Sequence, residues 1–181
     1  MEMDVFERIV ERANLAPSVH NTQPARWRLS DGAIDLFCDR EVRLPAGDPE
    51  GRDAALSCGA ALEATVRALA DEGIGTDVAL ADWRNIATKT GGLAHVARIT
   101  PGAAVAPDTL GCALERRFTH RGAFDPADIQ GWAPSDAVLV TDREGKARIA
   151  ALNDAVSLAA LRDGPARREL VAWMRLSERH P

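Results

Sequence analysis

A short loop bounded by two prolines carries the first side chains that could do chemistry. Its hydroxyl and amide groups come from Ser18, Asn21, Thr22 and Gln23. Each proline fixes its backbone φ, so the polar groups between them are held with little loss of conformational entropy. Hydroxyls and amides on a rigid loop suit a planar heterocycle that presents both donors and acceptors. The alternative is a tight loop whose polar side chains satisfy their own backbone, and both interpretations stay open.

A basic segment near residue 120 is the second candidate. Arg117, Thr119 and Arg121 alternate along it, so in an extended conformation their side chains lie on one side. Two guanidinium groups and a hydroxyl could hold a phosphate, because arginine meets phosphate oxygens through paired charge-assisted hydrogen bonds. Basic residues are also favourable at the end of a helix for electrostatic reasons alone, and this alternative stays open.

The elements on either side of the polar loop follow from spacing and turn residues. Apolar residues at helical spacing predict a first helix, capped by Asp4 and ending at or before Ala16 because a proline follows. Two alternating segments, Ala25–Leu29 and Ala33–Cys38, predict strands. The Ser-Asp-Gly sequence at residues 30–32 is typical of a hairpin turn between them.

A long helix is predicted to begin at Asp48-Pro49, as N-cap and first helical residue, and to reach about Glu72. Its middle is small and apolar on all sides. Such a helix is usually buried, with close backbone neighbours at Gly59 and Cys58 as a core residue.

The rest of the chain continues this alternation of helical and extended segments. Strands are predicted at Thr76–Trp83, Ala94–Thr100 and Asp136–Val140, and helices at Pro107–Arg117, from Asp142 to about Leu161, and from Gly164 through Leu176. This order predicts an α+β fold with an antiparallel or mixed sheet flanked by helices. No repeat or long linker interrupts it, so residues 1–181 are interpreted as a single domain.

The composition is that of an ordinary globular protein: 181 residues, 46% hydrophobic and 27% charged, with a net charge of −5. The negative charge argues against nucleic-acid binding, and no apolar run is long enough for a membrane helix. Three widely separated cysteines and an acidic first segment without a basic leader predict reduced thiols in a cytoplasmic protein. Cysteines and histidines lack metal-ligand spacing, so no metal site is predicted.

Together the two polar segments resemble a known family, the flavin-dependent nitroreductases. The loop resembles the A-P-S-x-x-N-x-Q-P motif of that family, and the basic segment resembles its R-x-[ST]-x-R flavin-phosphate motif. Residues 48–52 and 56–62 are similar to the long Acg-type branch, whose chains hold two nitroreductase-like halves, of which this chain resembles the N-terminal one. The resemblance covers roughly residues 10–125.

The resemblance implies a bound FMN at a dimer interface. The basic segment would hold the phosphate through Arg117, Thr119 and Arg121. The loop would lie near the flavin ring or its ribityl chain through Ser18, Asn21 and Gln23. Family members commonly pass a hydride from NAD(P)H through FMN to a nitro compound, a quinone or another small oxidant in a ping-pong reaction. Because the flavin carries the chemistry, no catalytic side chain is predicted.

Three departures from the family pattern keep other functions open. The order of the two motifs is reversed relative to single-domain members, as expected of the long branch. Ala25 occupies a place where the family usually has tryptophan, and Trp27, two residues on, faces the same side of the strand. The long branch has a second half, so this chain would pair with another copy or a partner half, be a fragment, or have lost activity. The alternatives are a silent protein that sequesters flavin and an interaction module that has lost it.

Overall fold

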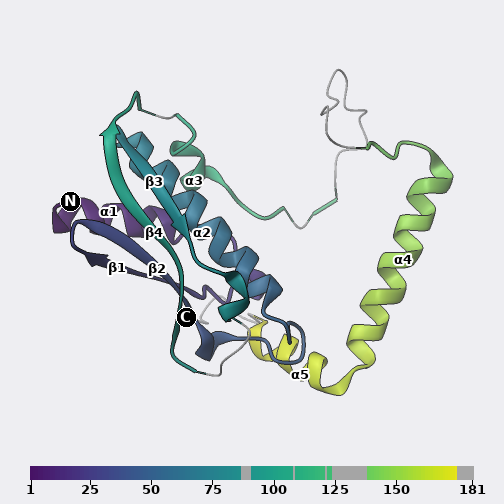
Figure 1. The fold of residues 1–181 in the computed structure, drawn as a ribbon. Coiled ribbons are helices and arrows are strands. Elements are labelled where there is room, and N and C mark those ends of the chain that lie inside the picture. Colours follow the sequence, from purple (N-terminus) through teal and green to yellow (C-terminus); the bar gives the residue numbers. More distant parts are fainter. Residues whose placement is uncertain (87–90, 108, 121, 124–137, 175–181) are drawn as a thin grey trace. The chain divides into compact units, whose positions relative to one another are not determined.

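The computed structural model describes residues 1–86, 91–107, 109–120, 122–123 and 138–174, and Figure 1 traces their course. Two compact units divide the chain. The first comprises Met1–Arg117 with Glu169–Pro181, and the second comprises Phe118–Arg168. The sheet and the polar loop belong to the first unit.

Four antiparallel strands form one sheet in the order β1-β2-β4-β3. Their bounds are Ala25–Ser30 for β1, Ala33–Asp39 for β2, Ile74–Leu80 for β3 and Leu93–Ala104 for β4. The predicted hairpin is present, with Asp31 and Gly32 at φ 52° and 76° between β1 and β2. Two successive left-handed residues match the right-handed twist of the flanking strands. The prediction of an α+β fold with an antiparallel sheet is therefore confirmed.

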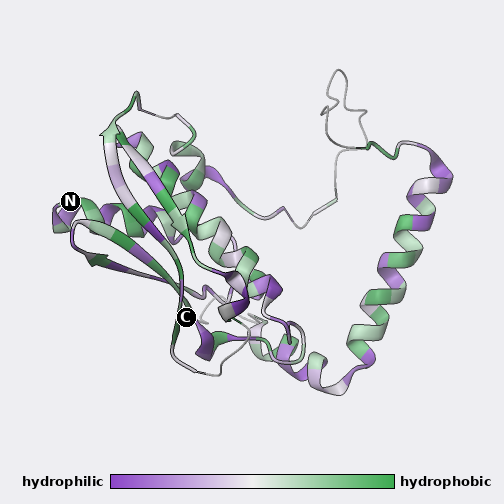
Figure 2. Cartoon of the chain, viewed as in Figure 1, coloured by the Kyte–Doolittle hydropathy of each residue, from purple (hydrophilic) through white to green (hydrophobic). Residues whose placement is uncertain are grey.

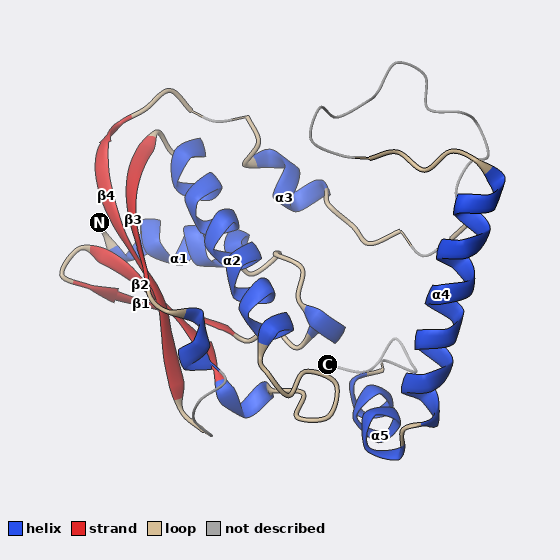
Figure 3. Cartoon of the chain, turned by 45° about the vertical axis from the view of Figure 1, so that its right-hand side comes forward, coloured by secondary structure: helices blue, strands red, loops and turns tan. Residues whose placement is uncertain are grey.

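Two helices, α1 Met3–Ala13 and α2 Arg52–Asp71, cover one face of this sheet (Figure 3). The other helices of the described residues are α3 Cys112–Arg116, α4 Arg143–Arg162 and α5 Gly164–Trp173, and the single 3₁₀ turns are η1 Val19–Asn21, η2 Arg40–Val42 and η3 Trp83–Ile86. The core lies between α1, α2 and the sheet, where five side chains have no exposed surface: Ile9, Ile34, Ala68, Leu69 and Ile99.

The starts of α1 and α2 differ from the prediction. Glu2, rather than Asp4, is the N-cap of α1, and its side chain makes no capping hydrogen bond. The N-cap of α2 is Gly51, with a left-handed φ of 69°, rather than Asp48. Asp48 still caps this helix from one turn earlier, because its Oδ2 accepts a hydrogen bond from Ala54 N–H at 2.9 Å.

The middle of α2 is buried on one side only, which corrects the expectation of an all-round buried helix. Cys58 is fully buried, as predicted. Gly59, by contrast, is exposed, and a Cβ added there would meet nothing within 4 Å, so close backbone packing is not its role. Leu56 is 65% exposed on the same open side. Because the residues in the middle of α2 are small and apolar on all sides, their types do not predict which side of the helix is buried.

The C-terminal elements agree with the prediction in part. Helix α4 begins after Asp142, whose Oδ1 accepts a hydrogen bond from Gly145 N–H at 2.7 Å, as expected of an N-cap. Helix α3 is shorter than predicted and starts at Cys112. Residues 138–140 form no strand, and the first part of that predicted strand lies outside the described residues. Strand β3 ends at Leu80, and Trp83 belongs to η3. Helix α5 ends at Trp173, and Leu176 lies outside the described residues.

Two cysteines far apart in the sequence meet in the core. Cys38 on β2 and Cys58 on α2 belong to one buried cluster, while Cys112 is exposed, and all three are free thiols. A hydrogen bond between the first two lowers the pKa of Cys38 and raises the pKa of Cys58, which burial raises further.

The burial of Cys38 and Cys58 can be tested by measuring how fast the thiols react. With Ellman's reagent, the folded protein is expected to react quickly at one thiol, that of Cys112, and at all three after denaturation. The Cys112→Ser variant should then show no fast reaction. Fast labelling of more than one thiol in the folded protein would contradict the burial of the pair.

In the part of the chain that the structure describes, no helix is long and apolar enough to cross a bilayer. Among the same residues, no group of three or more histidine, cysteine, aspartate or glutamate side chains is placed to hold a metal ion.

Candidate functional site

The polar loop between α1 and β1 has an unusual backbone. Three of its residues are not glycine and yet have left-handed φ values: His20 at 46°, Asn21 at 57° and Gln23 at 47°. Such values are uncommon for residues with a Cβ, and they persist only where surrounding contacts enforce them. Backbone strain of this kind clusters at ligand-binding and catalytic sites, so the loop is the strongest candidate site in the first unit.

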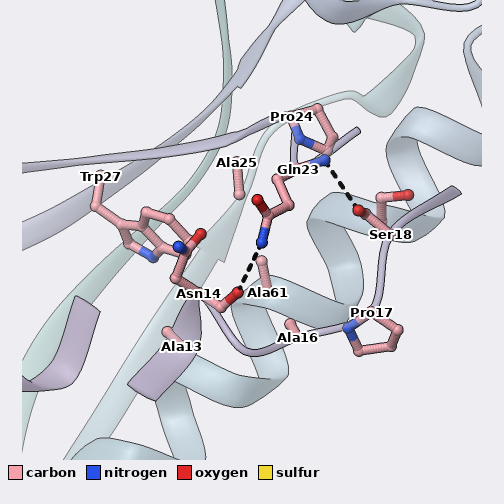
Figure 4. A pocket seen from close by; sticks show the side chains of 11 residues that line it. Ala13, Asn14, Ala16, Pro17, Ser18, Gln23, Pro24, Ala25, Trp27 and Ala61 are labelled. Carbon is pink, nitrogen blue, oxygen red and sulfur yellow. Dashed lines mark hydrogen bonds between the residues drawn. The ribbon is translucent and has the colours of Figure 1, made fainter. Parts of the chain in front are cut away.

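Two of the predicted site residues hold the loop in this conformation (Figure 4). Ser18 Oγ accepts a hydrogen bond from Gln23 N–H at 2.9 Å, which closes the loop. The side-chain Nε2 of Gln23 donates to Asn14 O at the end of α1, at 3.3 Å. These bonds are the ones that the tight-loop alternative requires. Asn21 differs from both, since it is exposed.

Helix α2 supports the loop through a residue that the sequence analysis did not select. Ser57 is buried, and its Oγ accepts a hydrogen bond from Val19 N–H at 3.0 Å. The same hydroxyl donates to Asp53 O, one turn earlier in α2, at 2.7 Å. Both roles of the hydroxyl are thereby used, and the loop is tied to the helix. A lone serine in an otherwise apolar helix segment is a weak signal that could have pointed to this contact.

The loss of this contact can be measured at the amide that it protects. Ser57→Ala removes the acceptor of Val19 N–H, so we expect faster hydrogen exchange at Val19 and a stability loss of about 1 kcal/mol. Thr65→Val is the matched control, because Thr65 Oγ1 makes the same two kinds of bond on α2, to Ala61 O and to Trp27 Nε1–H. Unchanged exchange at Val19 in the serine variant would show that the loop does not depend on Ser57.

Two hollows border the loop. The smaller one is lined by both Ala25 and Trp27, as predicted for side chains on the same side of a strand (Figure 4). The Trp27 indole is anchored by its bond to Thr65 Oγ1 at 2.9 Å. The larger one is an open groove of about 300 Å³, lined by Pro17, Ser18, Val19, Asp53, Leu56, Ser57 and Ala60.

The structure brings the start of the basic segment to the start of the polar loop. Arg117 follows α3 with extended backbone, at φ −67° and ψ 133°, as predicted for this segment. Its guanidinium donates to Leu15 O at 3.1 Å. Helix α3 is also tied to α1 by the ion pair of Arg12 and Glu115, at 3.4 Å. Segments about 100 residues apart in sequence therefore meet at the end of α1.

The surroundings of the other two residues of the alternating set, Thr119 and Arg121, are not part of the first unit as described. Thr119 is exposed and belongs to the second unit. Arg121 lies outside the described residues. The alternating phosphate clamp therefore stays a prediction, with Arg117 as the member whose surroundings are described.

The sequence was compared with those of known proteins to identify its family. No protein-family model matches the chain. In Mycobacterium tuberculosis H37Rv, the protein named "Putative NAD(P)H nitroreductase Rv3131" is 33% identical over 149 residues, which cover 80% of this chain and 40% of that protein. "Putative NAD(P)H nitroreductase acg" from the same strain is 47% identical over 60 residues, or 33% of this chain and 18% of that protein.

These sequence matches define the class of protein, since they agree with the two motifs and with the α+β fold. The chain belongs to the nitroreductase-like family. It spans about 40% of the length of the first of these relatives.

Solved structures match more distantly. The nitroreductase family protein from Streptococcus pneumoniae TIGR4 is 18% identical, with a TM-score of 0.46, and the match covers 78% of this chain and 90% of that chain. A Desulfovibrio desulfuricans protein, described as "a putative nitroreductase in complex with fmn", is 19% identical with a TM-score of 0.43, over 66% of this chain and 87% of that chain. The family assignment rests on the sequence matches.

Proposed function

We propose that this chain binds FMN at the polar loop and forms part of an NAD(P)H-dependent oxidoreductase that acts on nitro compounds or quinones. The proposed cofactor contacts are Ser18, Asn21, Gln23, Arg117, Thr119 and Arg121. The observation that carries the proposal is the strained loop with its three left-handed non-glycine residues, and the bond of Arg117 to Leu15 O, at the end of α1 just before this loop, supports it.

The donors and acceptors present at the loop fit this cofactor. A flavin ring presents both donors and acceptors along one edge, and the loop offers the amide of exposed Asn21 and the hydroxyl of Ser18. A phosphate needs positive charge, which Arg117 supplies at the start of the loop. When bound, FMN supplies hydride and electron transfer, whereas the chain binds it, orients it and limits access of water.

A second subunit is part of the proposal, either another copy of this chain or a partner half. Helix α4 supports it, because Ile149, Leu152 and Val156 are 56%, 67% and 62% exposed at spacings of three and four residues. This spacing places them on one stripe of the helix, and apolar and polar residues alternate along α4 in Figure 2. Apolar stripes of this kind are normally covered by another element. The same proposal treats residues 1–181 as one nitroreductase-like domain.

We also keep the cytoplasm as the proposed location, because the three cysteines are free thiols in the structure. NAD(P)H and a small oxidant are the proposed partners, in line with the names of the curated relatives.

An experiment with the loaded protein separates the proposal from its two alternatives. The protein is incubated with FMN, desalted, and mixed without air first with NADH or NADPH and then with a nitro compound or a quinone. Bleaching of the flavin band by the nucleotide, and its return on adding the oxidant, is the expected result. Bound FMN that no nucleotide bleaches would favour a flavin-sequestering protein. A protein that retains no FMN would favour an interaction module.

A further inference from the structure

Two core cysteines that the proposed function does not use lie together between the sheet and α2. Cys38 on β2 and Cys58 on α2 have no exposed surface and belong to one buried cluster, in which their thiols share a hydrogen bond. Two alanines of this cluster, Ala54 on α2 and Ala94 opposite Cys38 on β4, let the helix lie close to the strands. Sulfur atoms that share a hydrogen bond need only a small shift of either side chain to form a disulfide.

The two thiols differ in their chemistry. The hydrogen bond from Cys58 lowers the pKa of Cys38 against the effect of burial, and the positive charges of Arg40 and Arg43 also lower it. The same bond, together with burial, raises the pKa of Cys58. One sulfur therefore favours the nucleophilic thiolate while its neighbour stays protonated. This is the arrangement of a thiol that reacts with an oxidant beside a thiol that resolves the product.

Both cysteines are adjacent in sequence to residues that anchor the polar loop. Ser57, directly before the cysteine of α2, accepts a hydrogen bond from Val19 N–H. Asp39, directly after the cysteine of β2, donates its N–H to Pro24 O at 2.7 Å. These anchors hold opposite ends of the loop. Because packed interiors transmit small displacements, a change in the link between β2 and α2 is felt at both ends.

We propose that Cys38 and Cys58 are a peroxide-sensitive dithiol, whose oxidation to a disulfide ties β2 to α2 and tightens both anchors of the polar loop. The proposal does not rest on flavin binding. Hydrogen peroxide is close to water in size, so brief local openings of the core admit it, whereas the larger Ellman's reagent is excluded. Disulfides that form in a reducing compartment are usually transient and redox-sensing, as proposed for this pair.

The oxidation needs the peroxide and no further reactant. The Cys38 thiolate attacks one oxygen of the peroxide, the O–O bond breaks, and a sulfenic acid forms as hydroxide leaves and takes up the proton that the thiol released. Cys58 then attacks the sulfenic sulfur, so that the S–S bond forms and the S–O bond breaks. The Cys58 proton leaves with the hydroxyl group as water. The two thiols lose two electrons, and the peroxide is reduced to two molecules of water.

The test uses the Cys112→Ser variant, because Cys112 is exposed and its thiol would otherwise react first. The folded variant is treated with hydrogen peroxide, which catalase then removes, and is unfolded in N-ethylmaleimide. We expect no maleimide on the two remaining thiols, a digest product that joins residues 38 and 58, and full labelling after a reductant. Two labelled thiols after peroxide treatment would overturn the proposal.

Cys58→Ala and Cys38→Ala in the same background test the roles of the two thiols. In Cys58→Ala, peroxide should leave a sulfenic acid on Cys38, which dimedone traps. In Cys38→Ala, Cys58 should remain a thiol over the same time, because burial alone raises its pKa. Equal oxidation of the lone thiol in both variants would overturn the assignment of Cys38 as the attacking group.

Hydrogen exchange of the disulfide form measures the effect on the loop. The amides of Val19 and Asp39 should exchange roughly tenfold more slowly than in the dithiol form, because a cross-link opposes the opening that exposes them. Gly145 N–H, which bonds to Asp142 in the second unit, is the control and should not change. A disulfide that forms and leaves exchange at both loop anchors unchanged would overturn the proposed link to the polar loop.

Discussion

Arg117→Ala and Arg121→Ala are each expected to weaken FMN binding by roughly 1.5–3 kcal/mol, the range for a hydrogen bond to a charged group. The reason is the alternation of these arginines in an extended segment, which would direct both guanidinium groups to one phosphate. The structure adds that Arg117 donates to Leu15 O, between the end of α1 and the polar loop, so its loss would also loosen this junction. Affinity is measured by FMN titration of the apo-protein.

Arg116→Ala is the matched control for both arginine variants. Arg116 is exposed in the last turn of α3 and falls outside the alternating set, so it should leave FMN affinity within about twofold, a surface-substitution effect. If all three variants bind FMN equally, the basic segment is a solvated helix end, and its phosphate assignment is wrong. If only Arg117→Ala weakens binding, the role of the segment is to position the loop.

Ile34→Ala should destabilise the first unit by about 2–5 kcal/mol, the usual result of emptying a packed core site. Ile34 lies near the start of the inner strand β2, pairs with Ile99 of β4, and has no exposed surface. Urea denaturation monitored by tryptophan fluorescence gives the free energy of unfolding. Trp27 is a suitable reporter because it packs against the same cluster.

Leu80→Ala provides the comparison, because Leu80 is 72% exposed on the edge strand β3. Its effect should stay within about 0.5 kcal/mol. Equal losses in the two variants would mean that β2 is not the buried centre of the sheet. An Ile34→Ala variant that unfolds without a cooperative transition would show that this core holds the first unit together.

Local signals predicted most of the first unit. The Asp-Gly turn and the alternating residues on both sides fixed the β1–β2 hairpin, because turn chemistry and strand pattern act over a few residues. In the second unit, the start of α4 near Asp142 was predicted for the same reason. Helix α2 shows where this reasoning ends. Its alanines and glycine are equally compatible with burial and exposure, so the open side at Leu56 and Gly59 depended on which elements pack nearby.

The sequence predicted where the candidate site lies, but not its backbone conformation or its long-range contacts. The motif residues marked the loop, yet residue types do not reveal that His20, Asn21 and Gln23 adopt left-handed φ, since tertiary contacts enforce it. The bonds from Ser57 to Val19 and from Arg117 to Leu15 join segments far apart in the chain. No spacing rule in a single sequence predicts such contacts.

Retention of FMN is the central claim, and the absorbance spectrum of the purified protein tests it most directly, with mass analysis of whatever heating releases. The expected result is a flavin spectrum and a released compound of FMN mass, or the same spectrum after incubation with added FMN and desalting. A colourless protein that also fails to retain added FMN would contradict the account, and the interaction-module alternative would then be the better one.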